Sequence, residues 1–338
     1  MSKARVLQSG LLLIILSSTL YWIVEWLSPT SDRLFSDYSA RLNRVLDISI
    51  EPPPNQATLP QISWRDFHGE EPELNLSLLD SISLHACGLE QLVFEANSSL
   101  GKVASADYQL IWHSQIIQGL SQCVNSQQLK PALKQKLQNI LELKRQHLAV
   151  YWYNYLSQDK SIQRLWLGNT RLNTSPAAAY RQLSLQLSQL HSIGQRFTHG
   201  QSIDASELLG ISKQLSSAPT LRALAQELNS ASLWLVTISQ ALQQRQFSCQ
   251  QNQQDFSILQ NILNKVYMPK IQAYLAELDQ SLNLLNSPLS SLFNSQGLDR
   301  LPSSMLQLQQ NFHRANRQHV QQWQAILNSC DDKSSKQG

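Results

Sequence analysis

Helical periodicity is the feature that most constrains the fold of this chain. Apolar residues recur three and four positions apart in segment after segment, which places them on one face of an α-helix. Alternation of apolar and polar residues, the mark of a half-buried strand, does not reach a convincing length. The pattern predicts an all-α, multi-helix bundle with helices over residues 33–47, 74–86, 89–97, 104–122, 131–148, 162–167, 176–193, 204–215, 221–242, 256–282 (interrupted or kinked at Pro269) and 302–329.

The N-terminus predicts a membrane anchor. Lys3 and Arg5 precede an apolar stretch over residues 11–27, whose length of roughly 26 Å as a helix is marginally enough for the core of a bilayer. Positive charge before the stretch and aromatic residues at its outer end place the remaining chain in the periplasm, outside the cytoplasmic membrane. A cleaved signal peptide is the alternative, but small residues at the usual cleavage spacing are missing. The expected organisation is a single transmembrane helix over 1–28, a periplasmic helical domain over 29–330 and a disordered tail over 331–338.

The charge of the chain does not indicate a nucleic-acid partner. The net charge is +3 over 338 residues, whereas a nucleic-acid interface needs basic residues clustered on one face. The densest basic stretch is interpreted as the solvated face of a helix; it contains Lys130, Lys134, Lys136, Lys144 and Arg145.

Motifs for catalysis, metal binding or nucleotide binding do not stand out. His313 and His319 lie six residues apart on one expected helix and therefore on different faces. We predict no metal, no cofactor and no catalytic residue. The acidic group of Glu70, Glu71 and Glu73 carries no mark of a carboxylate pair held in a cleft, and we interpret it as a solvated loop.

One polar turn supplies the candidate ligand site. The segment 99–103, Ser-Leu-Gly-Lys-Val, faintly resembles a phosphate-binding loop, but it lacks the first glycine and the hydroxyl that follows the lysine. A turn that ends a helix is the simpler interpretation. Because short polar residues lie there between apolar helices, the predicted ligand-binding residues are Asn97, Ser98, Ser99 and Lys102.

Four aromatic residues lie close together on one expected helix: Tyr151, Trp152, Tyr153 and Tyr155. Residues so close in sequence point to different sides of a helix, so some of them must be exposed or contact a neighbour. They could line a groove for a peptide, glycan or lipid, but the sequence favours packing between helices.

The four cysteines predict two disulfides. Cys87, Cys123, Cys249 and Cys330 all lie in the part of the chain expected in an oxidising compartment. Antiparallel packing of the last two long helices would bring Cys249 and Cys330 to one edge, and Cys87 and Cys123 both fall at helix ends. We therefore predict Cys87–Cys123 and Cys249–Cys330, with crossed pairings and four buried free thiols as the alternatives.

The segment from Cys87-Gly88-Leu89 to Glu95-Ala96-Asn97-Ser98-Ser99-Leu100-Gly101-Lys102-Val103 resembles the signature of the bacterial domain-of-unknown-function family 3080. Residues 35–47 are similar to the opening helix of that family, and residues 312–330 to its last helix. The resemblance covers nearly the whole chain outside the expected anchor. It implies an exported protein of a Gram-negative bacterium, many members looking like lipoproteins, although this chain has no cysteine for lipid attachment. The family carries no established activity, so the resemblance implies no chemistry.

Three classes of function remain open. An anchor, an elongated helical body and the absence of recognisable chemistry favour a membrane-tethered interaction or scaffold module of the cell envelope. Its expected partners are the cytoplasmic membrane, through residues 11–27, and another envelope protein, with the oligomeric state left open. A binder of a small molecule or lipid between helices is the first alternative, which a deep apolar cavity would favour. An unrecognised envelope enzyme is the second, which a carboxylate or histidine with a shifted pKa inside a cleft would favour.

Overall fold

The computed structural model describes residues 30–54, 59, 64, 67–72, 84–127, 129–245, 247, 253–294 and 298–331. Within these residues all regular structure is helical, which confirms the predicted all-α class. The elements are α2 (Thr30–Leu46), the 3₁₀-helix η2 (Leu84–Cys87), α4 (Glu90–Asn97), α5 (Ser99–Lys102), α6 (Ala106–Asn125), α7 (Pro131–Gln146), α8 (Leu148–Gln158), α9 (Lys160–Leu167), α10 (Ala177–Thr198), α11 (Ala205–Ser217), α12 (Leu221–Arg245), α13 (Gln253–Ile262), the π-helix η3 (Leu263–Gln272), α14 (Ala273–Leu292) and α15 (Arg300–Asp331).

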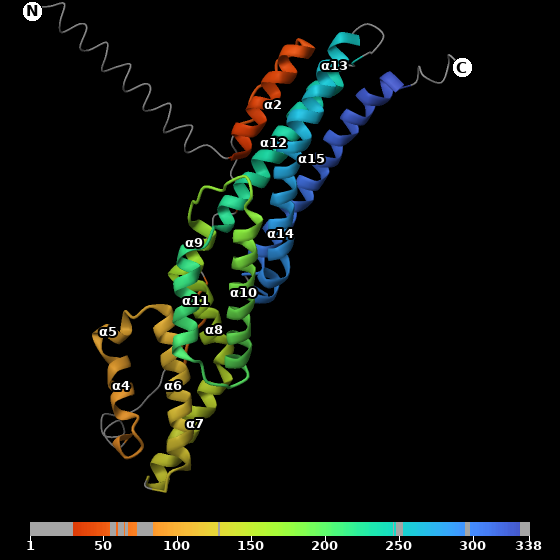
Figure 1. The fold of residues 1–338 in the computed structure, drawn as a ribbon. Helices are drawn as coiled ribbons and strands as arrows, with labels where there is room; N and C mark the ends of the chain where they lie inside the picture. The colour runs from red at the N-terminus through yellow and green to blue at the C-terminus, as the bar shows by residue number, and fades with distance from the viewer. Residues whose placement is uncertain are drawn as a thin grey trace, which may run out of the picture.

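The helices pack into an elongated molecule (Figure 1). At one end α12 packs along α15, and α2 packs against α12 and α13. The helices α4 to α7 form the other end, and α10 and α14 pack along each other between the two ends. The buried faces of these helices join in one hydrophobic core, so the described chain forms a single helical body.

The helix α2 begins at Thr30, before the predicted start at Arg33, because Glu227 of α12 caps it. The Glu227 carboxylate accepts hydrogen bonds from the backbone N–H groups of Thr30 (2.7 Å) and Ser31 (2.8 Å). Such N–H groups have no partner within their own helix, and the helix dipole favours a negative charge at this end. The Thr30 hydroxyl also donates to the carbonyl oxygen of Leu172 (2.5 Å). The first turn of α2 is thereby fixed against α12 and against the segment between α9 and α10.

A row of hydrogen-bonded side chains lies in the core between α2, α12 and α15. The Trp323 indole donates to the Tyr38 hydroxyl (2.8 Å), which lies 3.0 Å from His319 Nε2. His319 Nδ1 lies 3.1 Å from the hydroxyl of Ser239, which itself donates to the carbonyl oxygen of Leu235. The imidazole therefore donates from Nδ1 and accepts at Nε2, which is the neutral form. Complete burial lowers the pKa of His319 to about 3.

Two predicted helices differ from the observed ones within their length. The helix expected over 256–282 continues through Pro269, because α13, η3 and α14 follow one another without a break and η3 winds with the wider π-helical hydrogen bonding. Proline lacks an N–H and crowds the preceding turn, and a π-helical segment accommodates such a residue. The helix expected over 131–148 ends at Gln146, and α8 begins after the single residue His147.

Several predictions on the organisation of the chain fall outside the described residues. The predicted anchor over 1–28, the tail beyond 331 and most of the predicted helix over 74–86 lie there. Among the residues that the structure does describe, none of the helices combines the length and the apolar character needed to cross a membrane.

Candidate functional site

A cleft of about 580 Å³ opens near the α4–α7 end of the molecule. Its walls come from α4 and α5, from α6, from the first turns of α11 and from Glu71, which precedes α4 in the chain. The volume lies within the range of small-molecule pockets. Apolar and aromatic side chains supply much of the lining, among them Leu92, Ile111, Trp112 and Leu209.

The α4–α5 wall is attached to α6 by close packing and by a hydrogen bond. Leu89, just before α4, packs against Gly119 of α6 so closely that a Cβ at position 119 would overlap its side chain. Two helical turns before Gly119 on α6, the Trp112 indole donates to the carbonyl oxygen of Leu92 in α4 (2.8 Å). Glycine at position 119 therefore leaves room for the Leu89 side chain against α6.

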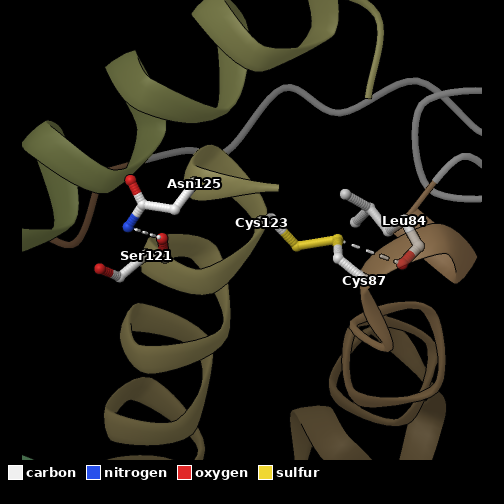
Figure 2. Close-up of a disulfide and its surroundings, with 5 residues drawn as sticks. All are labelled: Leu84, Cys87, Ser121, Cys123 and Asn125. Atoms are coloured by element: carbon white, nitrogen blue, oxygen red, sulfur yellow. Dashed lines mark hydrogen bonds between the residues drawn. A yellow bond between two sulfur atoms is a disulfide. The ribbon is translucent and has the colours of Figure 1, made fainter. Parts of the chain in front are cut away.

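A disulfide closes the same wall, between Cys87 and Cys123. Their Cα atoms lie 5.3 Å apart across a sequence separation of 36 residues. Figure 2 shows that the bridge joins the end of η2, beside Leu84, to the last turn of α6. It is the first of the two predicted pairings. Cys330 is disulfide-bonded as well, but Cys249 lies outside the described residues. The pairing of Cys249 with Cys330 therefore stays a prediction.

Three ionisable side chains form a hydrogen-bonded row at one edge of the cleft. Glu71 Oε2 lies 3.2 Å from His113 Nε2, and His113 Nδ1 lies 3.2 Å from Lys144 Nζ. Glu71 and His113 line the cleft, whereas Lys144 lies behind them with 1% of its surface exposed. An ammonium has only donors, so Lys144 donates to Nδ1 and His113 donates from Nε2 to the carboxylate. The row therefore consists of a carboxylate, a neutral imidazole and an ammonium.

Aromatic rings surround the ammonium of Lys144. Its Nζ lies 5.1 Å from the ring centroid of Trp112 and 4.9 Å from that of Tyr151, within the range of cation–π attraction. His113 stacks on Tyr151 with ring centroids 3.8 Å apart. Burial lowers the pKa of Lys144 to about 8, although the charge of Glu71 acts in the opposite direction. Ionisable groups with strongly shifted pKa values beside a cleft are concentrated at functional sites.

The pKa values of the two residues on the cleft wall are shifted as well. Burial lowers the pKa of His113 below its ordinary value of 6.5, and the hydrogen bond with Glu71 opposes this. For Glu71, burial acts to raise the pKa, yet the hydrogen bond with His113 and the neighbouring positive charge hold it below 4.5. At neutral pH the wall therefore presents a carboxylate next to an uncharged imidazole.

Asn154 of α8 positions Glu71. Its side-chain amide donates to Glu71 Oε1 (2.8 Å) and to the carbonyl oxygen of Gly69 (3.0 Å), and its oxygen accepts from the Gly69 N–H (2.7 Å). A Cβ at position 69 would come within 2.8 Å of Val150. Glycine at this position therefore allows the loop to approach α8 and to bring Glu71 to the cleft.

Of the predicted ligand-binding residues, only Asn97 lines the cleft. Ser98 caps α5, since its hydroxyl accepts from the Gly101 N–H (3.0 Å) and donates to the carbonyl oxygen of Glu95 (2.6 Å). Ser99 is exposed at the start of α5. Lys102 ends that helix, and its side chain lies outside the described part. The turn therefore has a structural role, in ending α4 and starting α5, while ligand binding by these residues stays a prediction.

One interpretation of the sequence is wrong at this site: Lys144 does not belong to a solvated helix face, because it is buried. Glu71 is exposed, as expected of the acidic loop, but it is also held by hydrogen bonds to Asn154 and His113 at the edge of the cleft. The signal for Lys144 is present in the sequence, since it shares an apolar stripe with Leu137, Leu141 and Leu148. A comparable signal for Glu71 does not exist, because its partner Asn154 lies 83 residues away.

Comparison with known proteins identifies the family of the chain and nothing more specific. Curated proteins and solved structures give no match. The family model described as "Protein of unknown function (DUF3080)" matches residues 35–333, which include every described helix that lines the cleft. Because the match extends over nearly the whole sequence, the chain belongs to the family of proteins of unknown function DUF3080.

Proposed function

We propose that this protein binds a small, largely apolar ligand in the cleft between α4, α6 and α11. The observation that carries the proposal is an apolar cleft of about 580 Å³ with the Glu71–His113–Lys144 row at its edge. Pockets that bind small molecules have this size and combine apolar walls with a few convergent polar groups.

The buried lysine supports a functional interpretation of the row. A charged group inside a protein destabilises the fold unless it is compensated, and an apolar residue at the same place is often as stable or more stable. Lys144 has the neutral His113 and the aromatic rings of Trp112 and Tyr151 as direct neighbours. A cation retained in such surroundings is better explained by the site it supports than by stability.

The test is a cleft-filling substitution, Ala96→Trp, compared with Ser188→Trp on the exposed face of α10. The full-length protein is screened against a library of apolar fragments by ligand-detected NMR. We expect the fragments bound by the wild type to bind the Ser188→Trp variant equally and to lose binding to the Ala96→Trp variant. Fragments that bind all three proteins alike, or a screen without any binding, would contradict the proposal.

The proposed setting of this binding is the periplasmic face of the cytoplasmic membrane, with residues 11–27 as an uncleaved anchor. Lys3 and Arg5 before that apolar stretch support the orientation. Alkaline phosphatase fused after Gly338 should be active in intact cells, and the mature protein should keep its full mass in the membrane fraction. A cytoplasmic fusion, or a new N-terminus between about residues 28 and 33, would contradict this location.

Four exposed apolar side chains that lie close together in the chain support a second candidate function, the binding of another envelope protein. They lie between α4 and the start of α6: Phe94 (41%), Leu100 (81%), Val103 (78%) and Tyr108 (58%). Exposed apolar side chains that form a contiguous patch often mark protein interfaces. A photo-crosslinking residue at position 100 should capture a specific envelope protein in cells, and the same residue at the exposed Leu185 of α10 should not. Equal capture at both positions would rule this candidate out.

A further inference from the structure

We propose that the ligand of the cleft is an amphipathic organic cation, with an apolar body against α4 and α11 and an ammonium group directed at Glu71. This inference rests on the proposed binding function and specifies the chemical class of the ligand.

The charges on the cleft wall support a cation. Glu71 and Glu95 both line the cleft, and the described lining contains no lysine or arginine. The ammonium of Lys144 lies behind His113 and is buried there. A carboxylate ligand would therefore meet two carboxylates, and like charges at close range are strongly disfavoured in a partly desolvated site.

The hydrogen bonds of Glu71 leave room for a ligand. Oε1 accepts from Asn154 and Oε2 from His113, and a carboxylate can accept about four hydrogen bonds in all. The side chain is 32% exposed, so its remaining lone pairs can be reached from the cleft. Because Asn154 and His113 already fix the carboxylate, an incoming ammonium would find its acceptor in place.

The aromatic residues of the lining fit the same ligand. Tyr108 and Trp112 both line the cleft and lie one turn apart on α6. The faces of such rings attract cations, including alkylammonium groups. Nearby Leu92, Ile111 and Leu209 supply the apolar surface for the body of the ligand.

The experiment uses three probes with one apolar body and different head groups. The ammonium form of 1-adamantylmethylamine, 1-adamantanemethanol and adamantane-1-carboxylate are titrated into the full-length protein by calorimetry at pH 7. We expect the ammonium to bind at least about tenfold more tightly than the alcohol, the usual size of one charge-assisted hydrogen bond, and the carboxylate to bind most weakly. The variant Glu71→Gln should lower the affinity for the ammonium by about tenfold and leave the alcohol unchanged. Glu142→Gln, on the exposed face of α7, is the matched control and should change neither.

The outcomes separate this inference from the function on which it rests. The preference for cations is refuted if all three probes bind with equal affinity or if the carboxylate binds best. If the Ala96→Trp variant abolishes that binding, the cleft still binds ligands and the proposed function stands. An ammonium affinity that is the same in Glu71→Gln and in the wild type also refutes the preference for cations. If none of the probes binds, the inference is refuted, and the fragment screen decides separately on the proposed function.

Discussion

Replacement of Lys144 by methionine tests whether the buried ammonium serves the fold or the site. Methionine keeps the unbranched apolar stem and its packing, and removes the charge. At about 1.36 kcal/mol for each pKa unit, a pKa lowered from 10.5 to about 8 means that the fold disfavours the charged form of Lys144 by about 3 kcal/mol relative to its neutral form. The substitution removes this penalty.

The same substitution also removes favourable contacts. Two cation–π contacts, with Trp112 and Tyr151, are lost, each about 0.5–1 kcal/mol or more in a desolvated site. His113 Nδ1 loses its donor, as does the Tyr151 hydroxyl, which lies 3.5 Å from Lys144 Nζ, and together these losses cost about 1–3 kcal/mol. Gains and losses largely cancel, so the free energy of unfolding of Lys144→Met at pH 7 should lie within about 2 kcal/mol of the wild type. Loss of a buried ion needed by the fold would instead cost about 3–5 kcal/mol.

The pH dependence gives the sharper comparison. Because the pKa of Lys144 is lower in the folded than in the unfolded chain, its penalty is complete below about pH 8 and is relieved as the pH rises toward 10.5. The wild type should therefore gain about 1 kcal/mol of stability between pH 7 and pH 9 relative to the variant. Tyrosines that titrate at high pH are common to both proteins and cancel in the difference.

The assay is urea unfolding followed by circular dichroism at pH 7, 8 and 9. Lys213→Met, at an exposed position of α11, is the control and should follow the wild type at every pH. A Lys144→Met variant that loses more than about 3 kcal/mol at pH 7, or that keeps the pH dependence of the wild type, would refute the reasoning.

Three further predictions concern the frame around the site. Replacing Cys87 and Cys123 together by serine should lower the free energy of unfolding by about 4 kcal/mol, as expected for a closed loop of 36 residues. Urea unfolding measures this change, and an unchanged midpoint of the urea transition would contradict the prediction. Gly194→Ala should destabilise the fold by about 1–3 kcal/mol, because the new Cβ overlaps the indole ring of Trp152 in α8. Gly210→Ala, in open space within α11, should leave the stability unchanged or raise it by up to about 1 kcal/mol. Equal effects of the two substitutions in thermal unfolding would contradict this prediction. Because the pKa of His319 is about 3 in the folded chain against 6.5 ordinarily, stability should fall as the pH drops below about 6.5, and His319→Gln should lose this part of the acid sensitivity.

Helix content and most helix positions could be predicted because they depend on local periodicity. The helix predicted over 204–215, for example, is α11, and Asp204 caps its first turn by accepting from the Ser206 N–H. The start of α2, which the sequence misplaces, is decided by a distant residue, since its cap, Glu227, lies 197 residues away from Thr30.

The candidate site could be predicted only in part, for a related reason. A lysine on an apolar stripe is visible in the sequence, and Lys144 stands on one. Its meaning depends on His113 and Glu71, which reach it from another helix and from a loop. A loop residue such as Glu71 has no periodicity that could reveal its contacts, and only the fold shows that Asn154 holds it.

The capture of the first turn of α2 by Glu227 determines the point from which the molecule can be held. Thr30 is bonded both to Glu227 at the start of α12 and to Leu172 between α9 and α10, so the described chain begins on the flank of the rod, away from both of its tips (Figure 1). A body tethered through that residue would be attached at its side and not at an end. Its two ends would then extend on opposite sides of the attachment point, and the part that carries the cleft would extend toward the α4–α7 end (Figure 1).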